Sequence, residues 1–79
     1  MGMVRLLTAA AKILIALEEG PKTFTEIKRE TGLSEGAVAL NLRNLEIQGL
    51  VSKNGRTYEL TEKGEVALEE LRIVVLSRR

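Results

Sequence analysis

The sequence predicts a mainly α-helical domain with one small β-hairpin, and three observations lead to this fold class. Helix-starting and helix-ending residues delimit four helical segments, at residues 4–19, 26–31, 35–48 and 62–79. The second and third segments are separated only by a tight turn that contains glycine. Two strand-like runs flank Asn54-Gly55, a dipeptide typical of hairpin turns. A chain of 79 residues with this pattern is expected to form a single domain over residues 1–79.

The composition argues against several classes of function. The chain has neither cysteine nor histidine, so the commonest metal ligands and the commonest general base are missing. No glycine-rich phosphate loop follows a strand, and the few serine and threonine residues are largely explained as caps and turns. We therefore expect no catalysis, no metal and no cofactor. The apolar run within residues 6–17 is too short to span a membrane, and we expect a cytoplasmic protein.

The net charge of +1 is only weakly basic, but the charges are unevenly distributed. Residues 22–56 contain six basic side chains against four glutamates, whereas residues 59–70 contain five glutamates against Lys63 alone. The middle of the chain is therefore the part expected to face a polyanion.

The first helix is predicted over Val4–Glu19 and ends at Gly20-Pro21, since glycine suits the position after a helix and proline cannot continue one. Its apolar side chains cover about half of the helix circumference, wider than the stripe of roughly 100° that a surface helix needs. We expect this helix to be covered on two sides. Residues 1–3 are expected to be disordered or a cloning remnant.

A pair of helices follows a short edge strand at residues 22–24. Thr25 is the predicted N-cap of the second helix, with Thr23 as a competing start because its spacing to Glu26 fits a capping box. Gly32-Leu33 forms the turn, and Ser34 caps the third helix, which extends to about residue 48.

The hairpin and the last helix complete the chain. Strands at residues 50–53 and 56–60 are joined by Asn54-Gly55, for which we predict a type I′ turn. Thr61 caps a final helix that begins at Glu62, with Gly64 as a weak point.

The order helix, strand, helix-turn-helix, hairpin, helix resembles a winged helix-turn-helix, in particular compact transcription regulators of the MarR and ArsR type. The resemblance covers Val4 to Leu76 and is carried by Thr25-Glu26-Ile27, Gly32-Leu33-Ser34, the anchors Val38 and Leu45, and Gly49-Leu50-Val51. Residues 55–64 are similar to the wing of small archaeal chromatin-type winged-helix proteins. This resemblance implies binding to double-stranded DNA, with the third helix in the major groove.

The candidate DNA-contacting residues lie on the outward face of the third helix and at the hairpin tip. Arginine can bond guanine bidentately and asparagine can do so with adenine, whereas small residues allow a close approach to thymine methyls or the backbone. The candidates are Ser34, Gly36, Ala37, Leu40, Asn41, Arg43, Asn44, Lys53, Asn54 and Arg56. The alternative is that these polar and charged side chains only solvate a helix face and a turn.

Leu40 and Ile47 favour a different partner. They form an apolar stripe on the same outward face, which suits a protein surface better than a phosphate backbone. An interaction module within a larger assembly is therefore the second functional hypothesis.

The first and last helices have more apolar surface than one small core can cover. We expect a homodimer formed by these two helices, with residues 62–79 as a dimerisation element, and the alternative is a crowded monomer core. The candidate dimer residues are Leu6, Ile13, Val66, Ile73 and Leu76. The sequence thus predicts a dimeric, DNA-binding transcription regulator or nucleoid-associated protein.

Overall fold

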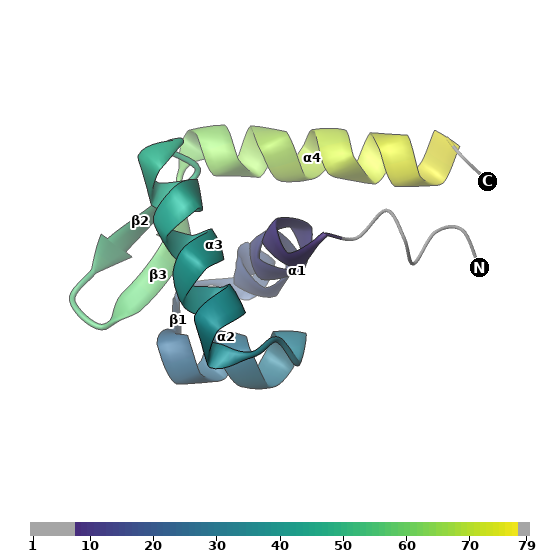
Figure 1. Cartoon of the computed structure of the whole chain (residues 1–79). Helices are drawn as coiled ribbons and strands as arrows, with labels where there is room; N and C mark the ends of the chain where they lie inside the picture. Colours follow the sequence, from purple (N-terminus) through teal and green to yellow (C-terminus); the bar gives the residue numbers. More distant parts are fainter. Residues whose placement is uncertain (1–7, 78–79) are drawn as a thin grey trace.

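The computed structural model describes residues 8–77, and the side chains as far as Ile73. Within this range the elements follow the order α1 (Ala9–Ala16), η2 (Leu17–Glu19), β1 (Lys22–Thr23), α2 (Phe24–Thr31), α3 (Glu35–Ile47), β2 (Val51–Asn54), β3 (Thr57–Leu60) and α4 (Glu62–Ser77). The hairpin β2–β3 projects from one end of the molecule, and α4 passes alongside α1 to the opposite end (Figure 1). The predicted winged helix-turn-helix is confirmed.

The first helix begins later than the sequence pattern suggested. Thr8 has an extended backbone, and its hydroxyl accepts a hydrogen bond of 3.1 Å from the backbone N–H of Ala11. Thr8 is thus the N-cap of α1, and the predicted continuous helix from Val4 is wrong, because apolar spacing alone does not reveal a cap. The predicted end is right, since Gly20 has a φ of 136° after the short 3-10 turn η2. Residues 1–7 lie outside the described range.

A complete capping box at Thr23 caps the N-terminus of the second helix. The Thr23 hydroxyl accepts from the backbone N–H of Glu26 at 3.2 Å, and the Glu26 carboxylate accepts from the backbone N–H of Thr23 at 2.8 Å. The competing start is therefore correct, and the prediction of Thr25 as N-cap is wrong. The reciprocal pair satisfies two N–H groups at once, which a cap at Thr25 would not do.

The third helix follows its prediction closely. Ser34 caps α3 by accepting from the backbone N–H of Ala37 at 3.2 Å, and Gly32 takes a left-handed φ of 72° in the preceding turn. Val38, Leu42 and Leu45 are buried along one face. They join α1 and α2 in an aliphatic core that contains Ile13, Leu14, Leu17, Ile27, Val38, Leu42, Leu45, Val51 and Leu68.

The three strands form an antiparallel sheet in the order β1-β3-β2. Asn54 pairs with Thr57, so the turn between them consists of Gly55 and Arg56. Only Gly55 has a positive φ there, at 65°, which is the pattern of a type II′ turn. The predicted type I′ turn at Asn54-Gly55 is wrong, because β2 extends through Asn54 and shifts the turn by one residue.

The start of α4 is held against the turn between α3 and β2. Thr61 donates its hydroxyl to the carbonyl of Gly49 at 2.6 Å and accepts from the backbone N–H of Gly64 at 3.0 Å. The backbone N–H of Thr61 also donates to the carbonyl of Leu50 at 3.1 Å. Gly64 is buried here, and a Cβ on it would clash with the Leu50 carbonyl. The predicted weak point is therefore a position of close backbone packing.

Candidate nucleic-acid interface

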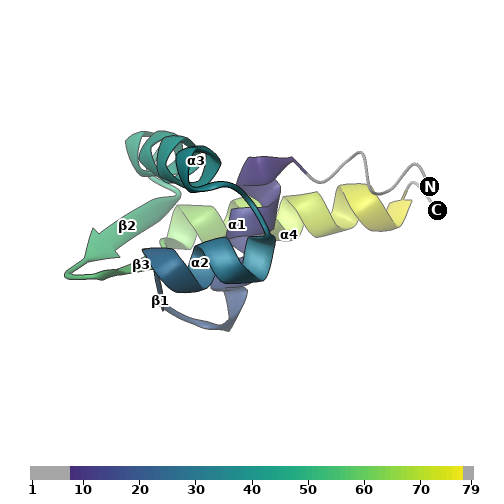
Figure 2. The ribbon, with the colours of Figure 1, turned by 60° about the horizontal axis from the view of Figure 1, so that its bottom comes forward.

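The outward face of α3 is exposed to solvent. The view in Figure 2 shows α3 standing clear beside the hairpin, with α2 in front of α1. Gly36, Leu40, Arg43, Asn44 and Ile47 are exposed on α3, opposite the buried face of the same helix. This arrangement leaves the predicted recognition face open to a large partner.

Some of the polar side chains predicted to contact DNA from α3 already form hydrogen bonds within the chain. The Asn41 side-chain amide donates to the carbonyl of Ala37 at 2.8 Å, and both residues are half-buried. The Ser34 hydroxyl is engaged as the helix cap. Arg43 and Asn44 are therefore the candidates on α3 with the most available hydrogen-bonding groups.

The hairpin, called the wing from here on, carries three exposed candidates at its tip: Lys53, Asn54 and Arg56. The Lys53 ammonium lies 5.6 Å from the centre of the Tyr58 ring, and the two residues are cross-strand partners. This cation–π contact orients the lysine while leaving its ammonium in solvent.

A hollow of about 420 Å³ lies between the wing and the first turn of α2. It brings together residues that are far apart in sequence because β1 pairs with β3. Its lining consists of Thr23, Phe24, Thr25, Lys53, Gly55, Arg56 and Tyr58. Sequence reasoning missed Thr25 and Tyr58 as candidates, since it predicted both strands but not the pairing of β1 with β3.

The charges near the interface are of mixed sign. Lys28 and Arg29 are exposed on α2, whereas Glu35 and Glu46 are exposed on α3. Lys22, counted with the basic part of the sequence, lies 3.3 Å from a Glu30 carboxylate oxygen and 3.5 Å from one of Glu19. The hydrogen bond with Glu30 is the main cause of a raised pKa for Lys22. The two carboxylates therefore balance the positive charge of Lys22, and this lysine contributes little to the attraction of a polyanion.

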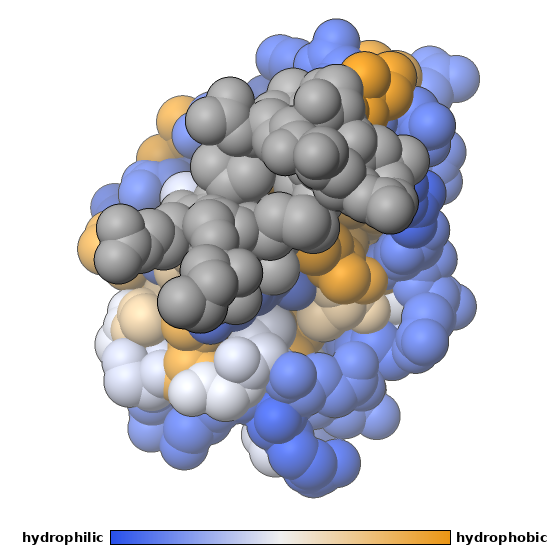
Figure 3. All heavy atoms as spheres, turned by 90° about the vertical axis from the view of Figure 1, so that its right-hand side faces the viewer, coloured by the Kyte–Doolittle hydropathy of each residue, from blue (hydrophilic) through white to orange (hydrophobic). Residues whose placement is uncertain are grey.

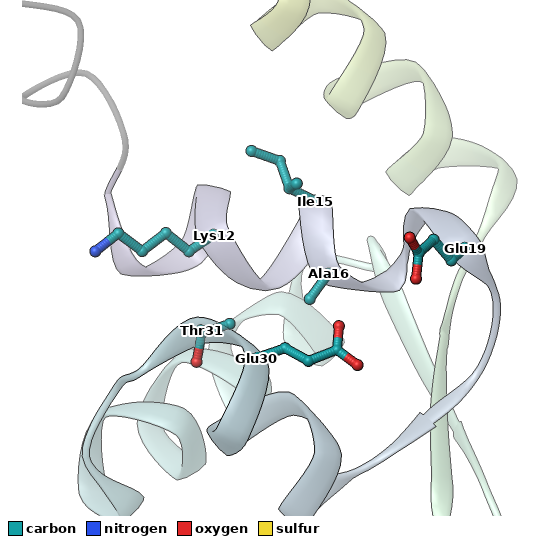
Figure 4. A pocket seen from close by; sticks show the side chains of 6 residues that line it. All are labelled: Lys12, Ile15, Ala16, Glu19, Glu30 and Thr31. Carbon is teal, nitrogen blue, oxygen red and sulfur yellow. The ribbon is translucent and has the colours of Figure 1, made fainter.

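A second hollow of about 410 Å³ lies between α1 and α2 (Figure 4). Lys12, Ile15, Ala16, Glu19, Glu30 and Thr31 line it. Its two carboxylates, those of Glu19 and Glu30, are the ones that form ion pairs with Lys22. Among residues 8–73 no group of three or more acidic side chains is arranged to hold a metal ion.

The dimer candidates fall into three groups. Val66 and Ile73 are 56% and 58% exposed, two turns apart on α4. Ile13 is 0% exposed in the core of the single chain, so it cannot contact a second chain and its prediction is wrong. Leu6 lies outside the described residues, as does the side chain of Leu76. Apolar side chains are visible among charged ones on the end of the molecule shown in Figure 3.

No helix within residues 8–77 is long and apolar enough to cross a membrane.

Comparison with known proteins gives a curated relative that is a transcriptional regulator. A curated relative, the uncharacterized HTH-type transcriptional regulator MJ0925 of Methanocaldococcus jannaschii, is 40% identical over 63 residues. The match covers 73% of this chain and 59% of the relative, so the chain spans well under two thirds of that protein.

Solved structures share the fold. BpsR of Bordetella bronchiseptica, whose DNA binding is regulated by 6-hydroxynicotinic acid, matches with a TM-score of 0.78 at 16% identity, covering 98% of this chain and 67% of that one. Quinone-bound YodB of B. subtilis matches with a TM-score of 0.69 at 30% identity, covering 82% and 78%. Both are MarR-type winged-helix regulators.

A family model described as the HVO_A0261 N-terminal domain matches residues 3–77, which is nearly the whole chain. Together with the winged helix-turn-helix built by α2, α3 and the wing, this match places the protein: the chain belongs to the HVO_A0261 N-terminal domain family.

Proposed function

We propose that this chain binds double-stranded DNA as part of a transcription regulator, with α3 in the major groove and the wing at the flanking backbone. The observation that carries the proposal is the exposed outward face of α3, where Arg43 and Asn44 present the two side-chain types best suited to guanine and adenine. The regulator MJ0925 and the DNA-binding protein BpsR support it as relatives in sequence and in fold.

The wing supplies the contacts that do not depend on base sequence. Lys53 and Arg56 line the hollow beside the first turn of α2, where Thr25 adds an exposed hydroxyl. Two cations and a hydroxyl around an open hollow suit the oxygens of a backbone phosphate. Because the net charge is only +1, we expect weak non-specific binding and a large share of specific contacts.

Two chains are proposed to act together. Val66 and Ile73 lie on the side of α4 that faces away from the buried Leu68, and pairing them across a two-fold axis would cover both. A dimer would also present two α3 helices to two half-sites on DNA. The proposed place of this DNA binding is the nucleoid, in the cytoplasm.

Substitution of three cations tests the DNA-binding proposal. Arg43→Ala should weaken binding to a preferred duplex by roughly 1–3 kcal/mol and relax its sequence preference, because a bidentate base contact is lost. Lys53→Ala and Arg56→Ala should weaken all duplexes alike and reduce the salt slope by about 1 each, because a phosphate contact is lost. Fluorescence anisotropy with enriched and random duplexes over a salt series measures both effects.

A matched control is Lys12→Ala, which removes an exposed cation from α1, outside the proposed interface. It should bind DNA as the unmodified protein does. Absence of salt-sensitive DNA binding by the unmodified protein would refute the proposal.

One observation favours a second candidate function, a protein interaction module. Leu40 and Ile47 are 61% and 75% exposed on the outward face of α3, where a DNA-reading helix usually carries polar residues. If the unmodified protein binds no DNA and Leu40→Glu abolishes binding to a purified protein partner, this second function replaces the first.

A further inference from the structure

The first two turns of α3 present a small apolar surface in the part of a recognition helix that contacts base edges. Leu40 is its largest member and is 61% exposed. Gly36 and Leu40 are four residues apart, so they share one side of the helix, and Gly36 leaves open space beside the leucine. An exposed leucine next to a glycine on the outward face of α3 suits an apolar group of a partner that approaches the helix closely.

Gly36 itself is not required by the fold. It lies in the first turn of α3 with no left-handed backbone, and a Cβ built on it meets no atom within 4 Å. Gly32, by contrast, has a φ of 72°, and Gly64 is packed against the Leu50 carbonyl. Glycine inside a helix costs up to about 1 kcal/mol relative to alanine. A glycine that the chain does not need for its own packing is explained by an external surface at that point.

The charges around this surface indicate which partner it meets. The elements on either side of α3 carry exposed cations, Lys28 and Arg29 on α2 and Lys53 and Arg56 on the wing, whereas α3 itself also carries exposed glutamates at both of its ends, Glu35 and Glu46. A partner that contacts Leu40 and also reaches α2 and the wing must match an apolar centre and cationic sides. A polyanion with an apolar group at its centre meets both requirements. In the major groove of DNA the apolar group on a base edge is the C5-methyl of thymine.

We propose that Leu40 reads a thymine methyl group in the major groove, with Gly36 allowing the helix to approach the base edge. The proposal rests on the DNA-binding function above and adds the base that is read. Arg43 lies three residues further along the same helix, about 4.5 Å along its axis. The preferred half-site therefore contains a thymine within about one or two base pairs of the guanine bound by Arg43.

Replacing thymine by deoxyuridine tests this directly, because it removes only the methyl group. The unmodified protein should bind the preferred duplex about fourfold more tightly than its deoxyuridine version, the value expected for burying one methyl group. Leu40→Ala should bind the thymine duplex more weakly and should no longer distinguish the two duplexes.

Two further variants sharpen the test. Ile47→Ala truncates another exposed aliphatic side chain of the outward face, two turns later, and should keep the discrimination between thymine and deoxyuridine. Gly36→Ala should fold at least as stably as the unmodified protein yet bind the preferred duplex at least several-fold more weakly, because its methyl group occupies the space left for the base edge.

The outcomes separate the inference from the function it rests on. If the unmodified protein binds DNA with the expected salt dependence but binds thymine and deoxyuridine duplexes equally, the thymine contact is refuted and the DNA-binding function stands. Equal discrimination by Leu40→Ala and the unmodified protein would refute the role of Leu40. If no duplex is bound, the DNA-binding function itself is refuted.

Discussion

Single residues in this domain have roles that their type alone does not reveal, and glycine gives the clearest example. Gly36 and Gly64 are both helical, yet Gly36 faces open space and Gly64 is packed against the Leu50 carbonyl, just before β2. The sequence predicted a weak point at Gly64 and a DNA-contacting position at Gly36, because local propensity contains no information on a neighbouring backbone. The structure distinguishes a glycine that the fold needs from one that it does not.

Gly64→Ala should destabilise the protein by about 1–3 kcal/mol, although alanine is the better helix former. The new methyl group would clash with the Leu50 carbonyl and lie 3.0 Å from the carbonyl carbon, and backbone cannot move aside as a side chain can. Urea unfolding followed by circular dichroism measures the change. Gly36→Ala is the control and should be neutral or slightly stabilising, and a stable Gly64→Ala would contradict this account of the packing.

The candidate site residues also fall into two groups, those whose environment was predictable from the sequence and those whose environment was not. Exposure of Arg43, Asn44, Lys53 and Arg56 follows from helix and hairpin periodicity, and it was predictable. The neutralisation of Lys22 was not, because it depends on Glu30, which reaches it only after α2 has packed beside β1. Contacts between elements have no local signature in a single sequence.

At the scale of elements, the predicted start of a helix was correct where the sequence offers a single capping residue directly before it. Ser34 and Thr61 are isolated candidates directly before a helix, and both are N-caps as predicted. Thr23 and Thr25 competed, and the choice depended on the reciprocal bond with Glu26. The wing was predicted as a hairpin, but its turn was misplaced by one residue, since strand length and not the dipeptide set the register.

The cap of α2 should make stability depend on pH in the acid range. The backbone hydrogen bond from Thr23 is the main cause of a lowered pKa for Glu26, below its usual value of 4.5. A lowered pKa in the folded state means that the stabilisation is complete above the unfolded value and is lost as pH falls through the folded one. The free energy of unfolding should therefore decrease as pH falls below about 4.5.

Glu26→Gln isolates this contribution, because it keeps a hydrogen-bond acceptor but cannot titrate. The variant should show a smaller decrease in stability between pH 5 and pH 3 than the unmodified protein, measured by urea unfolding at each pH. Glu35→Gln, an exposed first-turn glutamate of α3, is the matched control. The same pH dependence in Glu26→Gln and the unmodified protein would show that the capping carboxylate is not its source.

At the scale of the whole molecule, one chain leaves apolar side chains exposed on α4, and the proposed dimer depends on them. Ile73→Glu should weaken a dimer that forms at micromolar concentration, because a glutamate without a partner would be buried at the contact. Ile47→Glu adds the same charge to an exposed isoleucine of α3 and should leave association unchanged. Sedimentation without DNA measures both, and a monomeric unmodified protein would remove the basis for paired α3 helices.

The junction of α3, the wing and α4 has a mechanical consequence. The Leu50 carbonyl accepts from Thr61, the Gly49 carbonyl accepts from the Thr61 hydroxyl, and Gly64 lies against the same backbone. Because these contacts tie the start of α4 to residues 49–50 between α3 and β2, a change in the tilt of α4 is expected to move this segment with it. In the proposed dimer, a partner that tilts α4 would therefore be expected to change the distance between the two α3 helices.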